Sequence, residues 1–127
     1  IVAGDFNIKT YDPLYDYMST GEMAEDHPQN PTSTSPLPNF QLSFQPMHSA
    51  YKLCNGAEPE FTNLAKSSMN ETRFIETLDY IWLSDEFLVN RVRELPSKQS
   101  VIDAGIESFP NHDNPSDHVM IWADLSL

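Results

Sequence analysis

The sequence predicts a single α/β domain in which short strands outnumber helices. Its 127 residues are enough for one domain, and 39% hydrophobic residues with 11% aromatic residues are enough to form a buried core. Strand-like apolar runs begin at residues 1, 74 and 119, and an acidic residue lies within or next to each run. Polar groups at the ends of buried strands are typical of a binding or catalytic site.

Composition limits the classes of partner. Nineteen acidic residues against seven basic residues give a net charge of −12, which taken alone argues against a nucleic-acid partner. Clustered carboxylates are, however, what a divalent metal site requires. No apolar run approaches the ~20 residues that cross a membrane, so we expect no membrane partner. The single cysteine, Cys54, cannot form an internal disulfide. This favours an intracellular location, cytoplasmic or nuclear, and we expect Cys54 to be a small buried residue.

The first apolar run, residues 1–3, predicts a buried strand that ends at Gly4. Asp5 and Asn7 follow at a spacing of two. In an extended chain this spacing places both side chains on one face, where a carboxylate and an amide together suit binding. A turn is the alternative, because Asp, Asn and Gly are common turn residues.

A short amphipathic helix is predicted over residues 13–19. Asp12 is a suitable N-cap, Pro13 suits the first helical position, and apolar residues follow Leu14 at i+3 and i+4. Gly21 is the expected stop. The histidine at position 27 is expected to be a loop residue.

Residues 28–46 are rich in Pro, Ser, Thr and Asn and predict a long irregular segment. Phe40, Leu42 and Phe44 alternate within it. Such alternating apolar side chains would either hold the segment against the domain or line a ligand groove.

The middle of the chain predicts further short elements. Residues 47–53 resemble a strand or a turn leading to one, and Asn-Gly at residues 55–56 is a turn signal. Residues 61–64 predict another strand. Residues 65–73 are polar and are expected to form a loop.

Residues 74–83 predict the clearest strand, since β-branched and aromatic residues dominate the run. Asp79 lies inside it. A carboxylate in an apolar run is costly unless it is paired or hydrogen-bonded, so Asp79 is either functional or bonded to the backbone.

The last third predicts two strands separated by a loop. Residues 89–95 alternate as a strand does, with Val89 and Arg91 on the same face. Residues 97–114 are expected to form a loop that contains a solvated His112. Residues 119–127 predict the final strand, and Ser-Asp-His at residues 116–118 comes directly before it.

Three motifs in this order resemble the endonuclease/exonuclease/phosphatase superfamily: Gly-Asp-Phe-Asn at residues 4–7, Leu-Asp-Tyr-Ile at 78–81 and Ser-Asp-His at 116–118. Lesser motifs resemble the CCR4-type deadenylases with their nocturnin and Angel relatives; they lie at residues 17–21, 26–28, 49–51, 61–63 and 79–82. The resemblance implies that residues 1–127 are the C-terminal half of the catalytic domain. It implies half of a DNase I-like four-layer sandwich, with a mixed, mostly antiparallel sheet and few short helices.

The resemblance also implies magnesium-dependent 3′-to-5′ removal of poly(A) tails from mRNA. Asp5 would orient or deprotonate the attacking water, and Asn7 would donate to a phosphate oxygen. His118, when protonated, would donate to the oxygen that gains charge in the transition state. Asp79 would hold that imidazole and favour its protonated form.

Metal and substrate contacts follow from the same resemblance. Asp117 and Asp5 would bind Mg²⁺, with Mn²⁺ as the alternative cofactor. Asn7, Asn63 and Phe74 would contact the substrate, Phe74 by stacking on an adenine, although Phe74 is also a plausible core residue. The implied partners are poly(A) RNA, the N-terminal half of the domain and the subunits of a deadenylase complex.

One departure from the family pattern leaves alternatives open. The family's principal metal-binding Asn and Glu, and a catalytic His, come from the N-terminal half and have no counterpart in these residues. We therefore expect a fragment of a larger enzyme that is inactive alone. The alternatives on the same fold are a 2′-phosphatase, a 2′-phosphodiesterase, a DNA endonuclease, or a lipid or inositol phosphatase. An alternative of another class is a catalytically inactive interaction scaffold.

Overall fold

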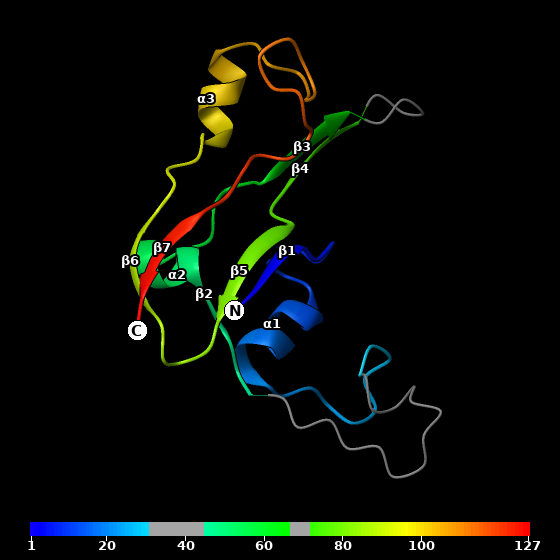
Figure 1. Cartoon of the computed structure of the whole chain (residues 1–127). Helices are drawn as coiled ribbons and strands as arrows, with labels where there is room; N and C mark the ends of the chain where they lie inside the picture. The colour runs from blue at the N-terminus through cyan, green and yellow to red at the C-terminus, as the bar shows by residue number, and fades with distance from the viewer. Residues whose placement is uncertain (31–44, 67–71) are drawn as a thin grey trace.

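The computed structural model describes residues 1–30, 45–66 and 72–127, so the predictions for Phe40, Leu42 and Phe44 lie outside the described residues. The elements in chain order are β1 (Val2–Asp5), α1 (Pro13–Thr20), β2 (His48–Ser49), α2 (Ala50–Asn55), β3 (Asn63–Lys66), β4 (Arg73–Glu76), β5 (Asp79–Leu83), β6 (Leu88–Val92), α3 (Lys98–Asp103) and β7 (Ala123–Ser126) (Figure 1). The four strand pairs in the described ranges are all antiparallel. The predicted α/β class with few short helices is confirmed, consistent with part of a DNase I-like fold.

The described strands form three small sheets. One has the order β1-β5-β2, the second pairs β3 with β4, and the third pairs β6 with β7. In Figure 1 the β3–β4 pair extends away from β5 toward the upper part of the view, and α3 lies at the same end.

Strand β5 separates two apolar clusters because successive side chains of a strand point to opposite faces. On one face Tyr80 and Trp82 pack against Tyr15 of α1. On the other face Ile81 and Leu83 pack with Ala50 of α2. A third cluster joins β3 to α3 and the following loop; its buried members are Phe61, Leu64, Val101 and Phe109.

The predicted single strand over residues 74–83 is wrong, because the chain changes sheets in the middle. Thr77 and Leu78 belong to neither β4 nor β5. The Thr77 hydroxyl donates to the Pro59 carbonyl at 2.6 Å, and the Leu78 amide donates to the Thr62 hydroxyl at 2.9 Å. These bonds replace the ladder bonds that a continuous strand would make, and they place Asp79 at the first position of β5.

The prediction that the first strand is buried is also wrong. All four residues of β1 are exposed, and Val2 is 47% exposed. Within the described residues β1 is an edge strand whose neighbour is β5. Gly4 does not end the strand but lies inside it, paired with Tyr80.

The helix prediction is confirmed at both ends. Asp12 is the N-cap of α1, and Gly21 adopts the left-handed conformation that follows the last turn. The Asp12 side chain makes no cap bond and instead accepts the Lys9 amide at 2.7 Å. The buried residue of this helix is Tyr15, which the simple periodic pattern did not single out.

Several boundaries differ from the predictions. Most of residues 47–53 belong to α2, and Lys66 and Arg73 are strand residues at the ends of the predicted 65–73 loop. Helix α3 lies inside the predicted 97–114 loop, where the Ser97 hydroxyl accepts the Ser100 amide. Cys54 is exposed, not buried, because it lies near the exposed end of α2.

The last two strands differ from the predictions in register and length. A register shift in β6 between Val89 and Arg91 interrupts the alternation, so Val89 and Val92 both pack against the core while Arg91 is exposed. Strand β7 begins only at Ala123. Ile121, Ala123 and Leu125 nevertheless share the core-facing side, as the alternation predicted.

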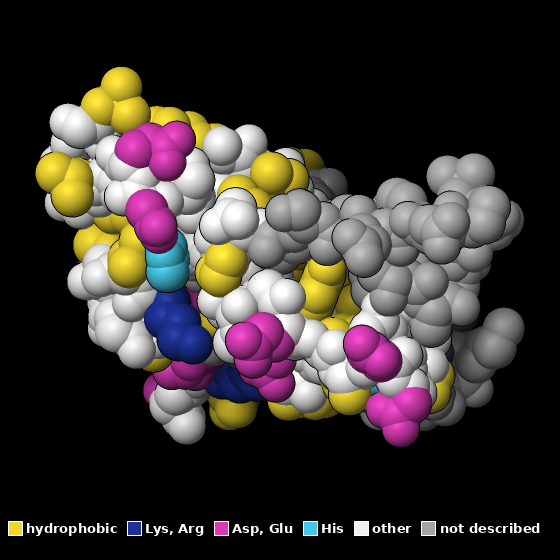
Figure 2. Space-filling model, turned by 90° about the horizontal axis from the view of Figure 1, so that it is seen from below, with side chains coloured by type: hydrophobic (Ala, Val, Ile, Leu, Met, Phe, Trp, Pro, Cys, Tyr) yellow, Lys and Arg dark blue, Asp and Glu magenta, His cyan; other side chains and the backbone are white. Residues whose placement is uncertain are grey.

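The surface reflects the acidic composition. On the face drawn in Figure 2, acidic side chains lie at several separate places, whereas lysine and arginine are confined to a small area. The described ranges contain no helix that is long and apolar enough to span a membrane.

Candidate active site

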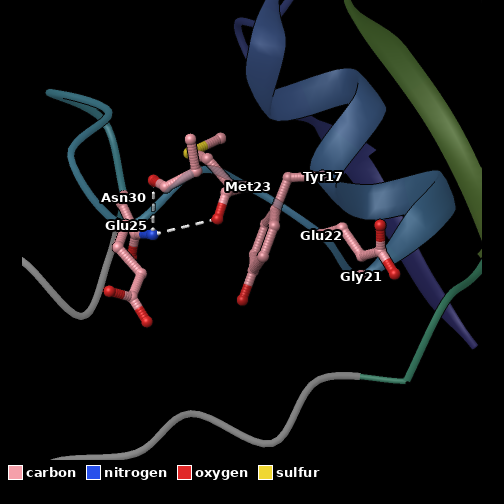
Figure 3. A pocket seen from close by; sticks show the side chains of 7 residues that line it. Tyr17, Gly21, Glu22, Met23, Glu25 and Asn30 are labelled. Atoms are coloured by element: carbon pink, nitrogen blue, oxygen red, sulfur yellow. Dashed lines mark hydrogen bonds between the residues drawn. The ribbon is translucent and has the colours of Figure 1, made fainter.

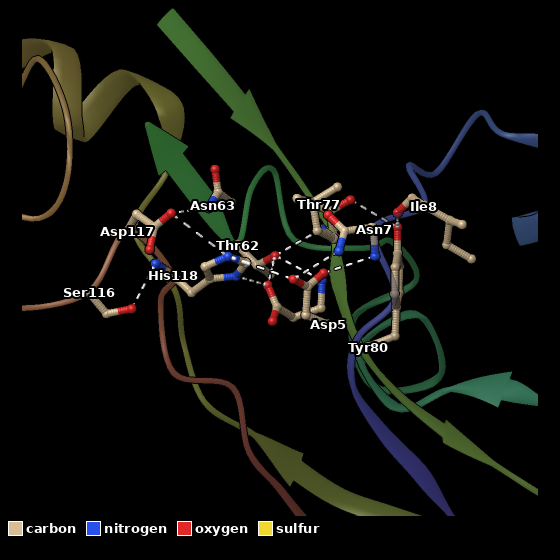
Figure 4. Close-up of polar contacts among 12 residues, drawn as sticks. Asp5, Asn7, Ile8, Thr62, Asn63, Thr77, Tyr80, Ser116, Asp117 and His118 are labelled. Carbon is tan, nitrogen blue, oxygen red and sulfur yellow. Dashed lines mark hydrogen bonds and ion pairs between the residues drawn. The ribbon is translucent and has the colours of Figure 1, made fainter. Parts of the chain in front are cut away.

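Three segments that are distant in sequence meet beside β5 (Figure 4). Asp5 and Asp79 are Cα partners at the end of the β1–β5 ladder. His118 is held by a bridge to Asn63 at the start of β3, and the Val119 amide donates to the Thr62 carbonyl at 2.7 Å. The change of sheet between β4 and β5 therefore brings Asp79 to the point where the loop before β7 crosses β3.

The imidazole of His118 is the centre of this site. Its Nδ1 lies 2.8 Å from Oδ2 of Asp79, a hydrogen-bond distance. Its Nε2 lies 3.9 Å from Oδ2 of Asp5 and 4.0 Å from Oδ2 of Asp117, distances too long for hydrogen bonds. One ring nitrogen is thus engaged by Asp79, and the other is near two carboxylates but remains available to a further oxygen atom.

The surroundings of His118 raise its pKa above the usual value of 6.5. Burial alone lowers the pKa, but the hydrogen bond and charge of Asp79 and the charges of Asp117 and Asp5 outweigh that effect. The side chain is 29% exposed. The site therefore favours an imidazolium that solvent can still reach.

Asp79 is fixed by Thr62, which is fully buried. The Thr62 hydroxyl donates to Oδ2 of Asp79 at 2.6 Å and accepts the amides of Leu78 and Asp79 at 2.9 and 3.0 Å. The sequence analysis assigned Thr62 no role. The role of Thr62 is visible only in the structure, where it lies beside the point at which the chain passes from β4 to β5. In the sequence, a threonine three residues after a proline forms no distinctive pattern.

Asn7 reaches Asp5 through a turn and not through an extended strand. Asn7 has a positive φ of 52°, a conformation that Asn tolerates better than most residues. Its amide nitrogen donates to Oδ1 of Asp5 at 2.9 Å, and its side-chain nitrogen lies 3.4 Å from Oδ2. Asp5 and Asn7 are therefore brought together by a turn, which was the alternative to an extended strand.

Asp117 is tied to β3 at two points. The Asn63 side-chain nitrogen donates to Oδ2 of Asp117 at 3.2 Å, and the Leu64 amide donates to the Asp117 carbonyl at 3.0 Å. Asn63 is only 4% exposed, so its side chain faces Asp117 and not open solvent. This burial favours a role in holding Asp117 over direct contact with a substrate.

Comparison with known proteins gives the family. No protein-family model matches the chain. It is 33% identical over 129 residues to carbon catabolite repressor protein 4 homolog 4 of Arabidopsis thaliana, a match that covers 100% of this chain and 27% of that protein. It is 30% identical over 126 residues to 2′,5′-phosphodiesterase 12 of Bos taurus, covering 98% and 19%. It is 30% identical over 130 residues to the CCR4-Not complex 3′-5′-exoribonuclease subunit Ccr4 of Coccidioides immitis, covering 100% and 16%.

The chain belongs to the endonuclease/exonuclease/phosphatase superfamily. Its relatives within the superfamily are CCR4-type proteins and 2′,5′-phosphodiesterase 12, which are nucleases and phosphodiesterases. The chain spans about a quarter or less of the length of these relatives.

Phe74, predicted to contact the substrate, is the Cα partner of Ala65, two residues beyond the Asn63 that bridges to His118. It lies in β4, is half-buried, and has the Lys9 ammonium 5.8 Å from its ring centroid. Asp5, Asn7, Asp79, Asp117 and His118 are brought together, with Asn63 directly behind them, whereas Phe74 lies further along the β3–β4 pair.

Binding of Mg²⁺ or Mn²⁺ by Asp5 and Asp117 stays a prediction. In residues 1–30, 45–66 and 72–127, no group of three or more His, Cys, Asp or Glu side chains could hold a metal ion. Asp5 and Asp117 each lie near Nε2 of His118, so in this structure the cationic group between the two carboxylates is the protonated imidazole.

One hollow on the surface adjoins this site, and a larger one does not. His118 lines a hollow of about 250 Å³ with residues of the 114–120 segment and Arg93. A hollow of about 610 Å³ lies at the end of α1, where Tyr17, Glu22 and Asn30 are among its lining residues (Figure 3). None of the residues predicted to be functional lines that larger hollow.

Proposed function

We propose that the protein containing this chain is a phosphodiester hydrolase that acts as a 3′-to-5′ exoribonuclease on poly(A) tails. The observation that carries the proposal is the convergence of Asp5 and Asp79 on the two nitrogens of His118. A scaffold has no need for three carboxylates around one imidazole, since polar groups at strand ends are costly to bury. The family relationship supports the hydrolase class.

The chain's own residues suit distinct steps of phosphodiester cleavage. With Nδ1 held by Asp79, protonated His118 presents the Nε2 proton to a phosphate oxygen that gains charge. Asp5, whose carboxylate is oriented by Asn7, accepts a hydrogen bond from the attacking water and aligns it. Asn7 retains a side-chain donor for a second phosphate oxygen.

A second candidate keeps the chemistry and changes the linkage. Relatives named 2′,5′-phosphodiesterase 12 match 98% of this chain at 29–30% identity, close to the values for the exoribonuclease relatives. The same imidazole and carboxylates would serve a 2′,5′-phosphodiester. The linkage that is cleaved would then depend on contacts with the sugar.

The test uses the full-length protein with two labelled substrates, a 3′,5′-linked and a 2′,5′-linked oligoadenylate. We expect stepwise shortening of the 3′,5′-linked substrate, and a reduction of about 10²- to 10³-fold in kcat for His118→Ala. His112→Ala is the matched control, because its side chain is 99% exposed and pairs with the adjacent Asp113. Shortening of the 2′,5′-linked substrate alone would select the second candidate. Unchanged turnover in His118→Ala would favour the scaffold.

The remaining parts of the proposal concern the rest of the protein. Residues 1–127 would be the C-terminal part of a catalytic domain, and the isolated chain would be inactive without the N-terminal half. A cation, Mg²⁺ or Mn²⁺, would need ligands beyond the described residues, and none of the roles above depends on it. Poly(A) RNA and subunits of a deadenylase complex are the proposed partners, in the cytoplasm or nucleus.

A further inference from the structure

A partly exposed aromatic and cationic cluster adjoins the candidate active site. It consists of Lys9 and Tyr11 in the loop after Asn7, together with Phe74 and Glu76 on β4. Phe74 and Glu76 are two residues apart in a strand, so they project from the same face. Ile75 projects from the opposite face and packs against the core. The cluster therefore lies on the side of β4 that faces away from that core.

Contacts within the cluster hold the Tyr11 ring in place. The Lys9 ammonium lies 5.3 Å from the Tyr11 ring centroid and 5.8 Å from that of Phe74, both within cation–π range. The Tyr11 hydroxyl lies 3.4 Å from Oε1 of Glu76. Despite these contacts Tyr11 is 65% exposed. A large ring that is positioned but uncovered contributes little to the core, and it would lose little entropy on binding a planar ligand.

The cluster lies close to His118 through the strand pairing. Glu76 is the Cα partner of Asn63, and Asn63 forms the bridge to His118. Two strand spacings separate Glu76 from His118, roughly 10 Å. A single nucleic-acid strand covers such a distance in about three nucleotides at the stacked spacing of about 3.4 Å.

The charges of the cluster suit a phosphate next to a base. The pKa of Lys9 is raised, first by its contact with Tyr11 and also by the charges of Glu76 and Asp12, so the ammonium keeps its charge at neutral pH. Tyr11 and Glu76 also line a hollow of about 570 Å³, whose other charged lining residues are Glu58, Glu60, Lys52 and Lys98. Lys9 and Tyr11 together, and not that hollow, therefore provide the local combination of cation and exposed ring.

We propose that Tyr11 and Lys9 form a nucleotide subsite beside the His118 site, where a base of single-stranded RNA stacks on Tyr11 and the adjacent phosphate contacts Lys9. The subsite rests on the proposed function, because it assumes that the polymer enters the same cleavage site. Any base can stack on the Tyr11 ring, and the Lys9 ammonium can contact the phosphate of any nucleotide. The subsite thus serves to hold the strand and not to read its sequence.

The experiment measures the binding of phosphorothioate-linked oligoadenylates of one to six nucleotides to the full-length protein. We expect the affinity of the wild-type protein to increase sharply at the length at which the oligoadenylate reaches Tyr11. Tyr11→Ala should lack this increase, which corresponds to an affinity about 5- to 150-fold lower for the longer oligoadenylates. Tyr11→Phe should retain it, because the ring remains. Lys9→Gln should lower the slope of log affinity against log salt by about 0.7 for the lost phosphate contact.

Two control variants match these changes. Trp122→Ala removes another exposed ring that has a cation beside it. The guanidinium carbon of Arg91 lies 5.4 Å from the Trp122 ring centroid, next to the β6–β7 pair and not next to β4. Lys66→Gln removes a lysine of the β3–β4 pair that is bound to Glu107 instead. Neither should change the length dependence or the salt slope.

The outcomes separate this inference from the proposed function. Tyr11→Ala affinity equal to wild type at every length, or reduced equally at every length, would overturn the subsite even if the enzyme shortens RNA. Absence of RNA binding by the wild-type protein would overturn it as well. A length step lost in Tyr11→Ala would support the subsite even if His118→Ala leaves turnover unchanged, a result that contradicts the proposed function alone.

Discussion

Two carboxylates of this protein have similar hydroxyl partners but opposite electrostatic surroundings. Asp79 accepts the Thr62 hydroxyl at 2.6 Å and contacts His118. Glu58 accepts the Tyr15 hydroxyl at 2.6 Å and the Ser49 hydroxyl at 2.8 Å, and no cation contacts it directly among the described residues. The first lies where two sheets meet, and the second lies between α1 and β2.

The pKa shifts of the two clusters show what this difference means. Burial is the main reason that the pKa of Glu58 is raised, and the bonds from Tyr15 and Ser49 and the charge of Lys52 only partly offset it. The pKa of His118 is raised against the effect of burial, by the surrounding carboxylates. A raised pKa favours the neutral form of Glu58 and the charged form of His118. The two pKa values therefore rise for different reasons: burial at Glu58 and neighbouring carboxylates at His118.

Among the changes that compare these two clusters, the largest expected effect comes from removing the charge of Asp79. Asp79→Asn keeps the size of the side chain but no longer supports the imidazolium, so we expect kcat of the full-length enzyme to fall about 10- to 100-fold. Glu58→Gln is the matched change in the other cluster and should leave kcat unchanged. Equal losses in the two variants would mean that both act only through stability.

Thr62→Val should reduce both stability and turnover. The change leaves the buried amides of Leu78 and Asp79 without their shared acceptor, at a cost of about 1–3 kcal/mol. Urea unfolding of the full-length protein measures this cost. Thr62→Ser keeps the hydroxyl and should restore turnover, and failure of the serine variant to do so would show that the lost methyl contacts matter more.

The titration of His118 should follow from its raised pKa. The stability contributed by its ion pairs is complete below the unfolded-state pKa near 6.5 and is lost as the pH rises through the higher folded-state pKa. NMR titration of the imidazole should place its pKa above the usual value of 6.5. Asp79→Asn should lower the His118 value, and an unchanged value would contradict the assigned cause.

The smallest expected effect concerns Glu58. Its raised pKa means that its contribution to stability is present below the usual value near 4.5 and is lost as the pH rises through the folded-state pKa. Glu58→Gln keeps an acceptor for the hydroxyls, so we expect stability at neutral pH to change by no more than about 1 kcal/mol. The variant should also show less change in stability across the acidic range, which unfolding curves at several pH values would reveal.

The local sequence pattern predicted the structure correctly where a feature depends on residues close together in the chain. The cap at Asp12, the stop at Gly21 and the alternation of Ile121, Ala123 and Leu125 were all predicted, because each depends on bonds or faces within a few residues. The predicted grouping of Asp5, Asp79 and His118 came from acids at the ends of apolar runs and from the resemblance. Their distances agree with a single site.

The sequence by itself determined which side chains are available: an acid after the first run, an acid inside the middle run and an imidazole before the last. Only the tertiary structure decided how they meet. The middle run divides into β4 and β5 because Thr62 and Pro59 accept bonds at the break. Those partners lie 16 and 18 residues away along the chain. Hydrogen bonds between such distant residues cannot be predicted from local periodicity. These two bonds place Asp79 at the start of β5, next to His118.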